Sequence, residues 1–334
     1  MTKKRCFAIF DKINSQRDYM KIHSKKIARY SIALFVIFSL NFIIPRLMPG
    51  DPITNLLGED YVMTEESLQE LREKMGLDES LPIQYLNYWN GVFRFDFGYS
   101  YHFKGPVSSI ILSRMKWTLM LLIPSILFSA ILGSLMGSLS GQKSSSNSFK
   151  ALTLIELAFY STPTFFLSLI FLYIFSFKLG LFPIKGFYYS GGIFDILHHF
   201  FLPISIMTIF LTSRNYMIMR GSVIQEKSKL YVVYAKAKGL SDRQVLFKHI
   251  FKNASLPLLT LLALDFGFIL SGALFIEIIF SMNGMGNLIY EALLSRDYPV
   301  LYGSFMIISI MAVLANAFVD FLYGIIDPRI SDSI

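Results

Sequence analysis

Residues 231–257 read YVVYAKAKGLSDRQVLFKHIFKNASLP, a polar and basic segment between two long apolar runs. Gly239 suits a helix C-terminus, because glycine adopts positive φ angles without steric cost. The residues from Ser241 to Gln244 fit a capping box, with Asp242 at the positive end of the helix that follows. The pattern predicts two short helices joined at Gly239, and such an ordered loop indicates a docking surface. Its cationic residues are Lys236, Lys238, Arg243, Lys248 and Lys252.

The composition indicates an integral membrane protein. The chain has 334 residues, of which 54% are hydrophobic and 16% are charged, with a mean hydropathy of +0.51. Soluble domains average about 25% charged residues. The net charge of +8 does not indicate nucleic-acid binding, because the basic residues adjoin the apolar runs. The single cysteine, Cys6, excludes an internal disulfide framework and a cysteine-based metal cluster.

The apolar runs predict an all-α polytopic membrane protein with six membrane helices. The first span covers 30–48 and follows a basic segment, 1–29. We interpret this start as a retained membrane anchor rather than a signal peptide, because no small-residue cleavage site follows. The other five spans lie in a transmembrane core, 115–326, at 117–142, 151–177, 196–213, 254–280 and 298–319.

The distribution of Lys and Arg predicts the orientation in the membrane. The basic segment 1–29, a loop at 220–255 and a tail at 327–334 are expected in the cytoplasm, with both termini. The acidic segment 49–114 is expected outside, as a small extracytoplasmic insert that contacts a partner.

The sequence lacks the motifs of several enzymes. There is no G-x-x-x-x-G-K-[ST] phosphate-binding loop and no H-E-x-x-H metalloprotease motif. Gly133 and Gly137 predict close packing between helices rather than a nucleophile site. His198 and His199 are interpreted as polar anchors rather than metal ligands, since no third ligand is nearby. No metal site is predicted.

Acidic residues within the apolar runs are candidates for function, because a charge is costly inside a membrane. They are Glu156, Asp265, Glu277 and Asp320. Glu277 and Asp320 lie near helix ends, where solvent or headgroups reach, which favours a structural role. For Asp265, near the middle of its span, two interpretations stay open: it lines a water-filled pathway, or it makes a buried hydrogen bond.

The loop resembles the cytoplasmic EAA loop of permease subunits of bacterial ABC importers, in the dipeptide, oligopeptide and nickel branch. The match is A-K-A-K-G-L-S at 235–241, followed by His249, Asn253-Ala254 and Pro257. Val233 stands where the general motif has a glutamate, and Asp265 stands where the family has a neutral residue. Further matching segments are Pro49-Gly50-Asp51-Pro52, Gly76-Leu77-Asp78, Asp96-Phe97-Gly98-Tyr99-Ser100, Ser161-Thr162-Pro163, Leu181-Phe182-Pro183, Arg296-Asp297-Tyr298-Pro299 and Asp327-Pro328-Arg329.

The resemblance implies a type I ABC importer permease in the bacterial inner membrane. Its partners would be the lipid bilayer, a second homologous permease, two cytoplasmic ATPases that carry the ATP and magnesium, and an extracytoplasmic solute-binding protein. This chain itself would bind no cofactor. The implied ATPase-coupling residues are Ala235, Lys238, Gly239, Leu240, Ser241, Asp242 and His249, and the candidate pathway residues are Asp265 and Glu277.

Within this family the cargo stays open between peptides and nickel or a metal chelate. Ala235, Ala237 and Leu240 are small or apolar enough to enter a groove of the ATPase. Two other classes remain as alternatives: a membrane receptor or channel without a motor, and an intramembrane enzyme, for which the sequence offers no convergent nucleophile and base.

Overall fold

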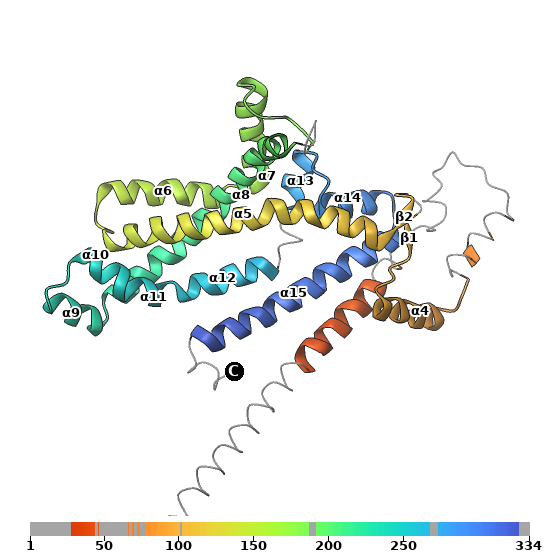
Figure 1. The fold of residues 1–334 in the computed structure, drawn as a ribbon, viewed down its shortest axis with the longest axis horizontal. Helices are drawn as coiled ribbons and strands as arrows, with labels where there is room; N and C mark the ends of the chain where they lie inside the picture. The colour runs from red at the N-terminus through yellow and green to blue at the C-terminus, as the bar shows by residue number, and fades with distance from the viewer. Residues whose placement is uncertain are drawn as a thin grey trace, which may run out of the picture.

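The fold is an elongated bundle of helices in a computed structural model, which describes residues 28–43, 46, 66, 69, 72–73, 78–100, 102–186, 192–267 and 273–326 (Figure 1). Most of the predicted segment 1–29, all of 327–334 and the first part of the insert, 49–65, lie outside the described residues. The first described helix is Ala28–Ile43. The other helices are α4 (Leu81–Arg94), α5 (Val107–Gln142), α6 (Asn147–Ser161), α7 (Thr164–Phe171), the π-helix η1 (Leu172–Lys178), α8 (Ile193–Lys227), α9 (Leu230–Ala237), α10 (Asp242–Val245), the π-helix η2 (Leu246–Ile250), α11 (Phe251–Ala254), α12 (Leu256–Gly267), α13 (Leu274–Ile279), α14 (Met285–Leu294) and α15 (Tyr298–Ile326).

The described part of the insert adds one small sheet to the expected all-α fold. Strands β1 (Tyr99–Ser100) and β2 (Gly105–Pro106) pair antiparallel, with Tyr99 opposite Pro106. Helix α5 begins at Val107, so the last residues of the predicted insert are part of this helix.

Three helices are long and apolar enough to cross a membrane: α5, α8 and the stretch Tyr298–Phe318 of α15. They contain the predicted spans at 117–142 and 196–213 and most of the span at 298–319. The bent pair of α6 with α7 and η1 makes a fourth if it counts as one span. The described residues therefore supply three or four such helices, against the six expected. For the predicted span at 30–48 the structure has only the shorter apolar helix Ala28–Ile43. The predicted span at 254–280 is not described in full, because residues 268–272 after α12 lie outside the described residues.

The predicted span at 151–177 is not one continuous helix, because the chain bends by 102° between α6 and α7. Thr162 has an extended backbone, with φ of −90° and ψ of 126°, and Pro163 follows it. Proline supplies no backbone N–H and its ring disfavours helical geometry in the preceding residue, so the helix ends there.

Helices α5 and α8 form the longest packed pair in the bundle, and glycines on α5 allow their close approach. A Cβ on Gly133 would lie 2.6 Å from Cβ of Asn215, and one on Gly137 would lie 2.7 Å from the carbonyl oxygen of Tyr216. A Cβ on Gly141, the next glycine of this row, would lie 2.8 Å from Cβ of Val223. The predicted packing role of Gly133 and Gly137 is confirmed.

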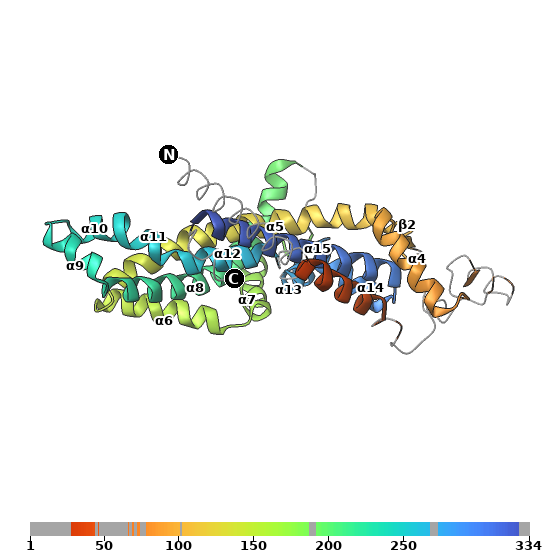
Figure 2. The ribbon, with the colours of Figure 1, turned by 90° about the horizontal axis from the view of Figure 1, so that it is seen from below.

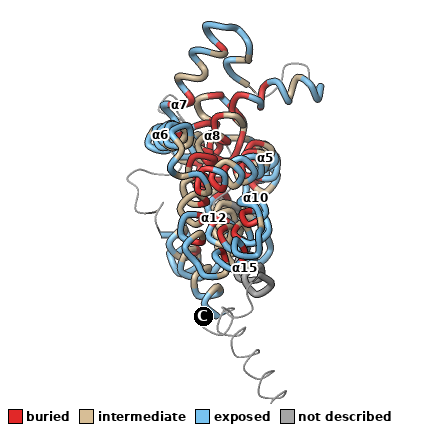
Figure 3. Tube along the Cα trace, turned by 90° about the vertical axis from the view of Figure 1, so that its left-hand side faces the viewer, coloured by how far each residue is buried: buried red, intermediate tan, exposed pale blue. Residues whose placement is uncertain are grey.

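The two ends of the bundle carry different structures. Helices α9–α11 lie at one end, and α4 with the two strands lies at the other (Figure 2). Buried residues concentrate along the middle of the bundle, where α5 and α8 pass, whereas the outward sides of the helices are mostly exposed (Figure 3). Exposed leucine, isoleucine and phenylalanine side chains along these outward sides are expected where helices face lipid.

Candidate functional site

The turn at Gly239 closes α9 in a Schellman motif. The N–H of Gly239 donates to the carbonyl of Lys236 at 2.9 Å, and the N–H of Leu240 donates to that of Ala235 at 3.4 Å. Gly239 has a φ of +83°, and a Cβ placed on it would meet nothing within 4 Å. Glycine is therefore required here by the backbone conformation rather than by lack of space.

The predicted capping box at the start of α10 is confirmed. The N–H of Gln244 donates to Oγ of Ser241, and the N–H of Ser241 donates to Oε1 of Gln244 at 3.0 Å. Across the same turn, Nζ of Lys236 lies 2.7 Å from Oδ1 of Asp242. The hydrogen bond from this lysine, and its charge, lower the pKa of Asp242. Three local interactions thus fix the angle between α9 and α10.

Helix α9 has an inner and an outer face. Val232 and Ala235 are buried, and they pack in a cluster that we call the loop core, which consists of Met219, Val223, Val232, Ala235, Val245, Leu246, Ile250, Ala254 and Leu258. The expectation that Ala235 enters a partner's groove is therefore wrong for this conformation. Leu240 is half-buried against the same cluster.

The opposite side, which we call the outer α9 face, consists of Leu230, Val233, Tyr234 and Ala237. Their spacing of three, four and seven residues places them on one side of a helix. Leu230 is 73% exposed and Tyr234 is 67% exposed, so the face has no cover within the described chain. Val233, the residue in place of the motif glutamate, lies within this face.

The other predicted coupling residues lie at the exposed edge of the loop. Lys238, Gly239, Ser241 and Asp242 meet at the turn, and His249 is exposed on η2. The structure brings the first four together, whereas His249 lies one helical segment further along the chain.

Polar contacts that the sequence did not predict fasten the loop to the membrane helices. Nζ of Lys227 donates to the carbonyl of Gln142 at 2.8 Å, at the C-terminus of α5 where the helix dipole favours a cation. Glu226 is buried at the end of α8 and accepts the hydroxyl of Tyr231 at 2.5 Å. Lys229 also pairs with Glu226. The loop is thus fixed to both α5 and α8.

Asp265 on α12 forms an ion pair with Arg214 on α8. Their side chains are 13% and 24% exposed, respectively. The pair fits the buried-interaction alternative for Asp265, and in this conformation Asp265 presents no unpaired negative charge to a cargo. Arg214 was missed by the sequence reasoning, although an arginine at the end of one apolar run and an aspartate within another are the signal for such a pair.

Glu277 is only 1% exposed, so the expectation that solvent reaches it is wrong. Its carboxylate accepts the hydroxyl of Thr118 at 2.5 Å and the N–H of Asn287 at 3.1 Å. A Cβ on Gly284 would lie 2.2 Å from Oε1 of Glu277, which explains the glycine before α14. Glu277 therefore satisfies the free N–H groups at the start of α14, a structural role.

The remaining candidates also have partners. Glu156 accepts the hydroxyl of Ser213 at 2.6 Å, which joins α6 to α8. His198 pairs with the carbonyl of Leu181, and His199 with that of Asp195, both at 2.8 Å. The side chain of Asp320 lies outside those described. Among the described residues, no group of three or more His, Cys, Asp or Glu side chains is placed to hold a metal ion.

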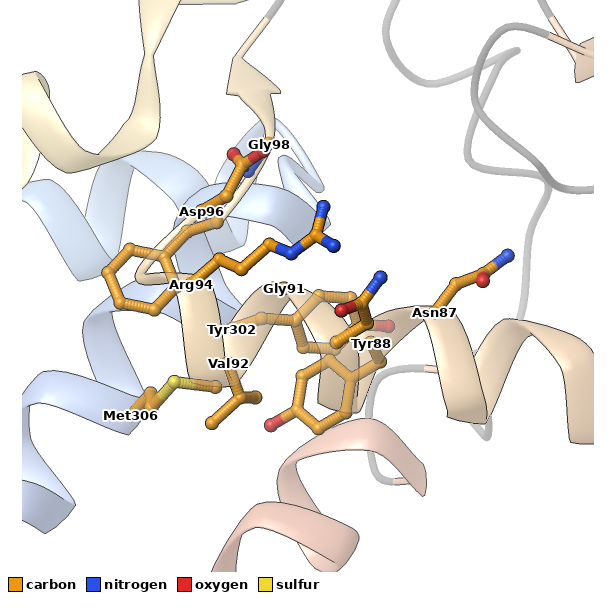
Figure 4. Close-up of a pocket in the computed structure, with 11 residues that line it drawn as sticks. Asn87, Tyr88, Gly91, Val92, Arg94, Asp96, Gly98, Tyr302 and Met306 are labelled. Carbon is orange, nitrogen blue, oxygen red and sulfur yellow. The ribbon is translucent and has the colours of Figure 1, made fainter.

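A cavity of about 390 Å³ opens at the opposite end, between α4 and α15 (Figure 4). Asn87, Tyr88 and Arg94 of α4 line it, together with Asp96 and with Tyr302 of α15. At the same end of the chain's fold, Oγ of Ser100 on β1 donates to Oδ2 of Asp297 at 2.5 Å, and Asp297 is fully buried. This contact fastens the insert to the start of α15.

Comparisons with known proteins agree over most of the chain. The profile of the family described as binding-protein-dependent transport system inner membrane component matches residues 111–332, and that of the membrane component's N-terminal region matches residues 20–122. A putative peptide permease protein of Brucella ovis is 33% identical over 301 residues, covering 89% of this chain and 94% of its own. A probable peptide ABC transporter permease protein of Sinorhizobium fredii is 32% identical over 290 residues, covering 86% and 92%. An oligopeptide transport system permease protein of Bacillus subtilis is 32% identical over 295 residues, covering 87% and 93%.

Proposed function

The chain belongs to the family of binding-protein-dependent transport system inner membrane components, and from this premise we propose that it forms half of the pathway of an ATP-driven peptide importer. It is a transport subunit of the membrane, as the sequence resemblance predicted. In the proposal it pairs with a homologous permease, receives cargo from an extracytoplasmic binding protein, and is driven by two cytoplasmic ATPases. Both termini and the loop at 220–255 face the cytoplasm.

The observation that carries the coupling role is the outer α9 face. Leu230, Val233 and Tyr234 are exposed apolar side chains at the tip of a basic loop. They lie on a helix whose C-terminus is closed by a Schellman motif and followed by the capping box of α10. A short, rigid helix loses little conformational entropy when it docks, because its backbone is already ordered. Basic side chains around this face suit a groove with an acidic rim.

The loop core supplies a route from this face to the membrane. Val232 and Ala235 belong to the same buried cluster as Met219 and Val223 of α8, Ala254 of α11 and Leu258 of α12. Lys227 adds the link to α5. Movement of a docked α9 would therefore displace these four helices together. Transport then requires that docking differ in free energy between the two states of the permease.

For the cargo we propose peptides, since three relatives that cover this chain almost completely are named for peptide or oligopeptide transport. Nickel or a metal chelate is the alternative within the same architecture. Uptake of a labelled tripeptide and of radioactive nickel(II) by the reconstituted complex distinguishes the two cargoes.

The test of coupling is peptide-stimulated ATP hydrolysis by the full complex in proteoliposomes. Tyr234→Asp places a charge on the outer α9 face, and we expect it to reduce stimulated hydrolysis at least tenfold. Lys185→Asp, an exposed charge change in the loop after η1, is the matched control and should have little effect. Full stimulation in Tyr234→Asp would contradict docking through this face. Failure of the ATPase to co-purify with the unmodified permease would favour the motor-less receptor or channel.

A further inference from the structure

Helix α4 lies at the end of the molecule opposite the loop, beside the described apolar helix Ala28–Ile43 (Figures 1 and 2). Trp89 stacks on Phe35 with ring centres 5.3 Å apart, and Tyr85 meets Phe42 edge-on at 5.1 Å. Tyr88 also donates its hydroxyl to the carbonyl of Phe38 at 3.2 Å. The side of α4 that contains Tyr85, Tyr88 and Trp89 is therefore packed against the apolar helix.

A second apolar stripe of α4 is uncovered. Leu86 and Phe93, seven residues apart and thus on one side of the helix, are 66% and 77% exposed. Phe93 contacts Trp89 with ring centres 5.7 Å apart, and Trp89 in turn stacks on Phe35, which is itself 55% exposed. The exposed surface of α4 is thus continuous with the exposed surface of helix Ala28–Ile43.

The remaining side of α4 is polar. Asn87 and Arg94 line the cavity (Figure 4). By their spacing along α4 they lie about a quarter turn or more round the helix from Leu86 and Phe93. A helix with one apolar and one polar side, rich in aromatic residues, is the kind that lies in the plane of a membrane interface.

The aromatic residues around α4 mark the depth of that interface. Tyr85, Tyr88 and Trp89 of α4 lie close to Tyr298 and Tyr302 at the start of α15, with Tyr88 and Tyr302 ring centres 6.0 Å apart. Tyrosine and tryptophan are enriched at the level of the lipid headgroups. The guanidinium of Arg46 stacks over Phe42 at 3.5 Å and donates to the hydroxyl of Tyr302 at 2.8 Å. A cation at this level is typical of a helix end that reaches the headgroups.

We propose that α4 lies in the outer interface of the bilayer, with Leu86 and Phe93 inserted at the boundary of headgroups and acyl chains. The occupant of this stripe is lipid, because it continues the surface formed by Ile32 and Phe35, which are exposed on an apolar helix of a membrane protein. The polar side, with the cavity, faces the water outside. The inference depends on the membrane location of the chain and not on the proposed coupling or cargo.

The experiment uses the full complex in lipid nanodiscs, with Cys6, the only cysteine, changed to serine. Single cysteines replace Leu86 or Phe93 on the apolar stripe, and Asn87 or Arg94 on the polar side as matched controls. Each carries a nitroxide, whose relaxation is measured with oxygen, which concentrates in lipid, and with a water-soluble nickel chelate. We expect labels at Leu86 and Phe93 to respond at least threefold more to oxygen than to the chelate, and labels at Asn87 and Arg94 to show the reverse.

A larger response to the chelate at Phe93 would overturn the proposal. Loss of both responses at Phe93 that occurs only when the solute-binding protein is added would also overturn it, because it would identify a protein docking surface instead.

A second measurement leaves Leu86 and Phe93 unchanged, so that misfolding of the cysteine variants does not affect the result. In a Trp117→Phe background, Trp89 is the sole tryptophan of this chain, and the same complex with Trp89→Phe as well gives the background from the other subunits. Lipids brominated near the headgroup should quench its fluorescence more than lipids brominated near the chain end, and no quenching by either would contradict the insertion.

Discussion

The two ends of the molecule are built from contacts of very different range. In the loop at 220–255, Ser241 pairs with Gln244, Lys236 with Asp242, and Glu226 with Tyr231, all within six positions along the chain. At the end that carries α4, Ser100 pairs with Asp297 across 197 positions, and Arg46 with Tyr302 across 256. The turns of the loop therefore order locally, whereas the α4 end depends on the whole chain being folded.

The largest expected effect comes from the ion pair that joins the two helices entering and leaving the loop. Asp265→Asn leaves Arg214 charged and partly buried, and we expect the free energy of unfolding to fall by about 3–5 kcal/mol. The double variant with Arg214→Gln removes both charges and should recover most of the loss. The measurement is thermal unfolding of the purified complex in detergent. An unchanged midpoint for Asp265→Asn alone would show that the loop's helices do not depend on this pair.

The next effect concerns the α4 end. Asp297→Ala removes the acceptor for Ser100 and for the N–H of Val300 in the first turn of α15. We expect a loss of about 1–3 kcal/mol, because buried donors are left without partners. Asp96→Ala, at an exposed carboxylate of the same insert, is the control. Protease cleavage of the insert in the intact complex should accelerate for Asp297→Ala only. Equal protection in both variants would mean that long-range contacts do not order this end.

The third prediction tests whether the turn at Gly239 requires glycine because of its backbone conformation or because a side chain would not fit. Gly239→Val forces a β-branched residue into a left-handed conformation, at a cost of about 1–2 kcal/mol, and should abolish uptake while the complex still assembles. Gly239→Asn adds a side chain of similar size that tolerates this conformation, so uptake should be largely retained. Uptake and co-purification of the ATPase are measured for both variants. Equal activity of the two would contradict the role of the turn.

The smallest effect is expected for the exposed pair of Lys236 and Asp242. The pKa of Asp242 is lowered from 3.8, mainly by the hydrogen bond from Lys236. As the pH falls, Asp242 is therefore protonated in the unfolded chain before it is protonated in the folded chain. The contribution of the pair to the free energy of unfolding is present above pH 3.8 and is lost as the pH falls through the folded-state pKa. Asp242→Asn should lower the unfolding midpoint slightly at about pH 6, and the difference from wild type should shrink as the pH falls below 3.8. A difference that persists at low pH would need another cause.

The range of the contacts also explains what the sequence could predict. Gly239 and the Ser241 capping box were predictable, because each depends on neighbours in the chain. The inward orientation of Ala235 was not, since it depends on α8 and α12 arriving from elsewhere. The partners of Glu277, Asp297 and Arg214 were not predictable for the same reason. The sequence shows these three residues as charges near apolar runs, but it does not show which residues they contact.

The bend before α7 is an intermediate case. Pro163 is visible in the sequence, and the preference of a residue before proline for extended backbone was sufficient to place a break. The direction and size of the bend, 102°, depend on packing against other helices and could not be read from the proline alone.

The glycine row of α5 has a mechanical consequence. With the backbones of α5 and α8 in contact at Gly133, Gly137 and Gly141, neither helix can slide or tilt past the other without a steric clash. Over this stretch the two helices move as one unit, and the 35 residues of α8, which include Pro203, have a length of about 53 Å. A tilt of about 10° imposed at the Lys227 end would sweep the far end of a straight helix of this length through about 9 Å. In the importer that we propose, a small rotation of the loop is thereby magnified at the far end of the helix pair.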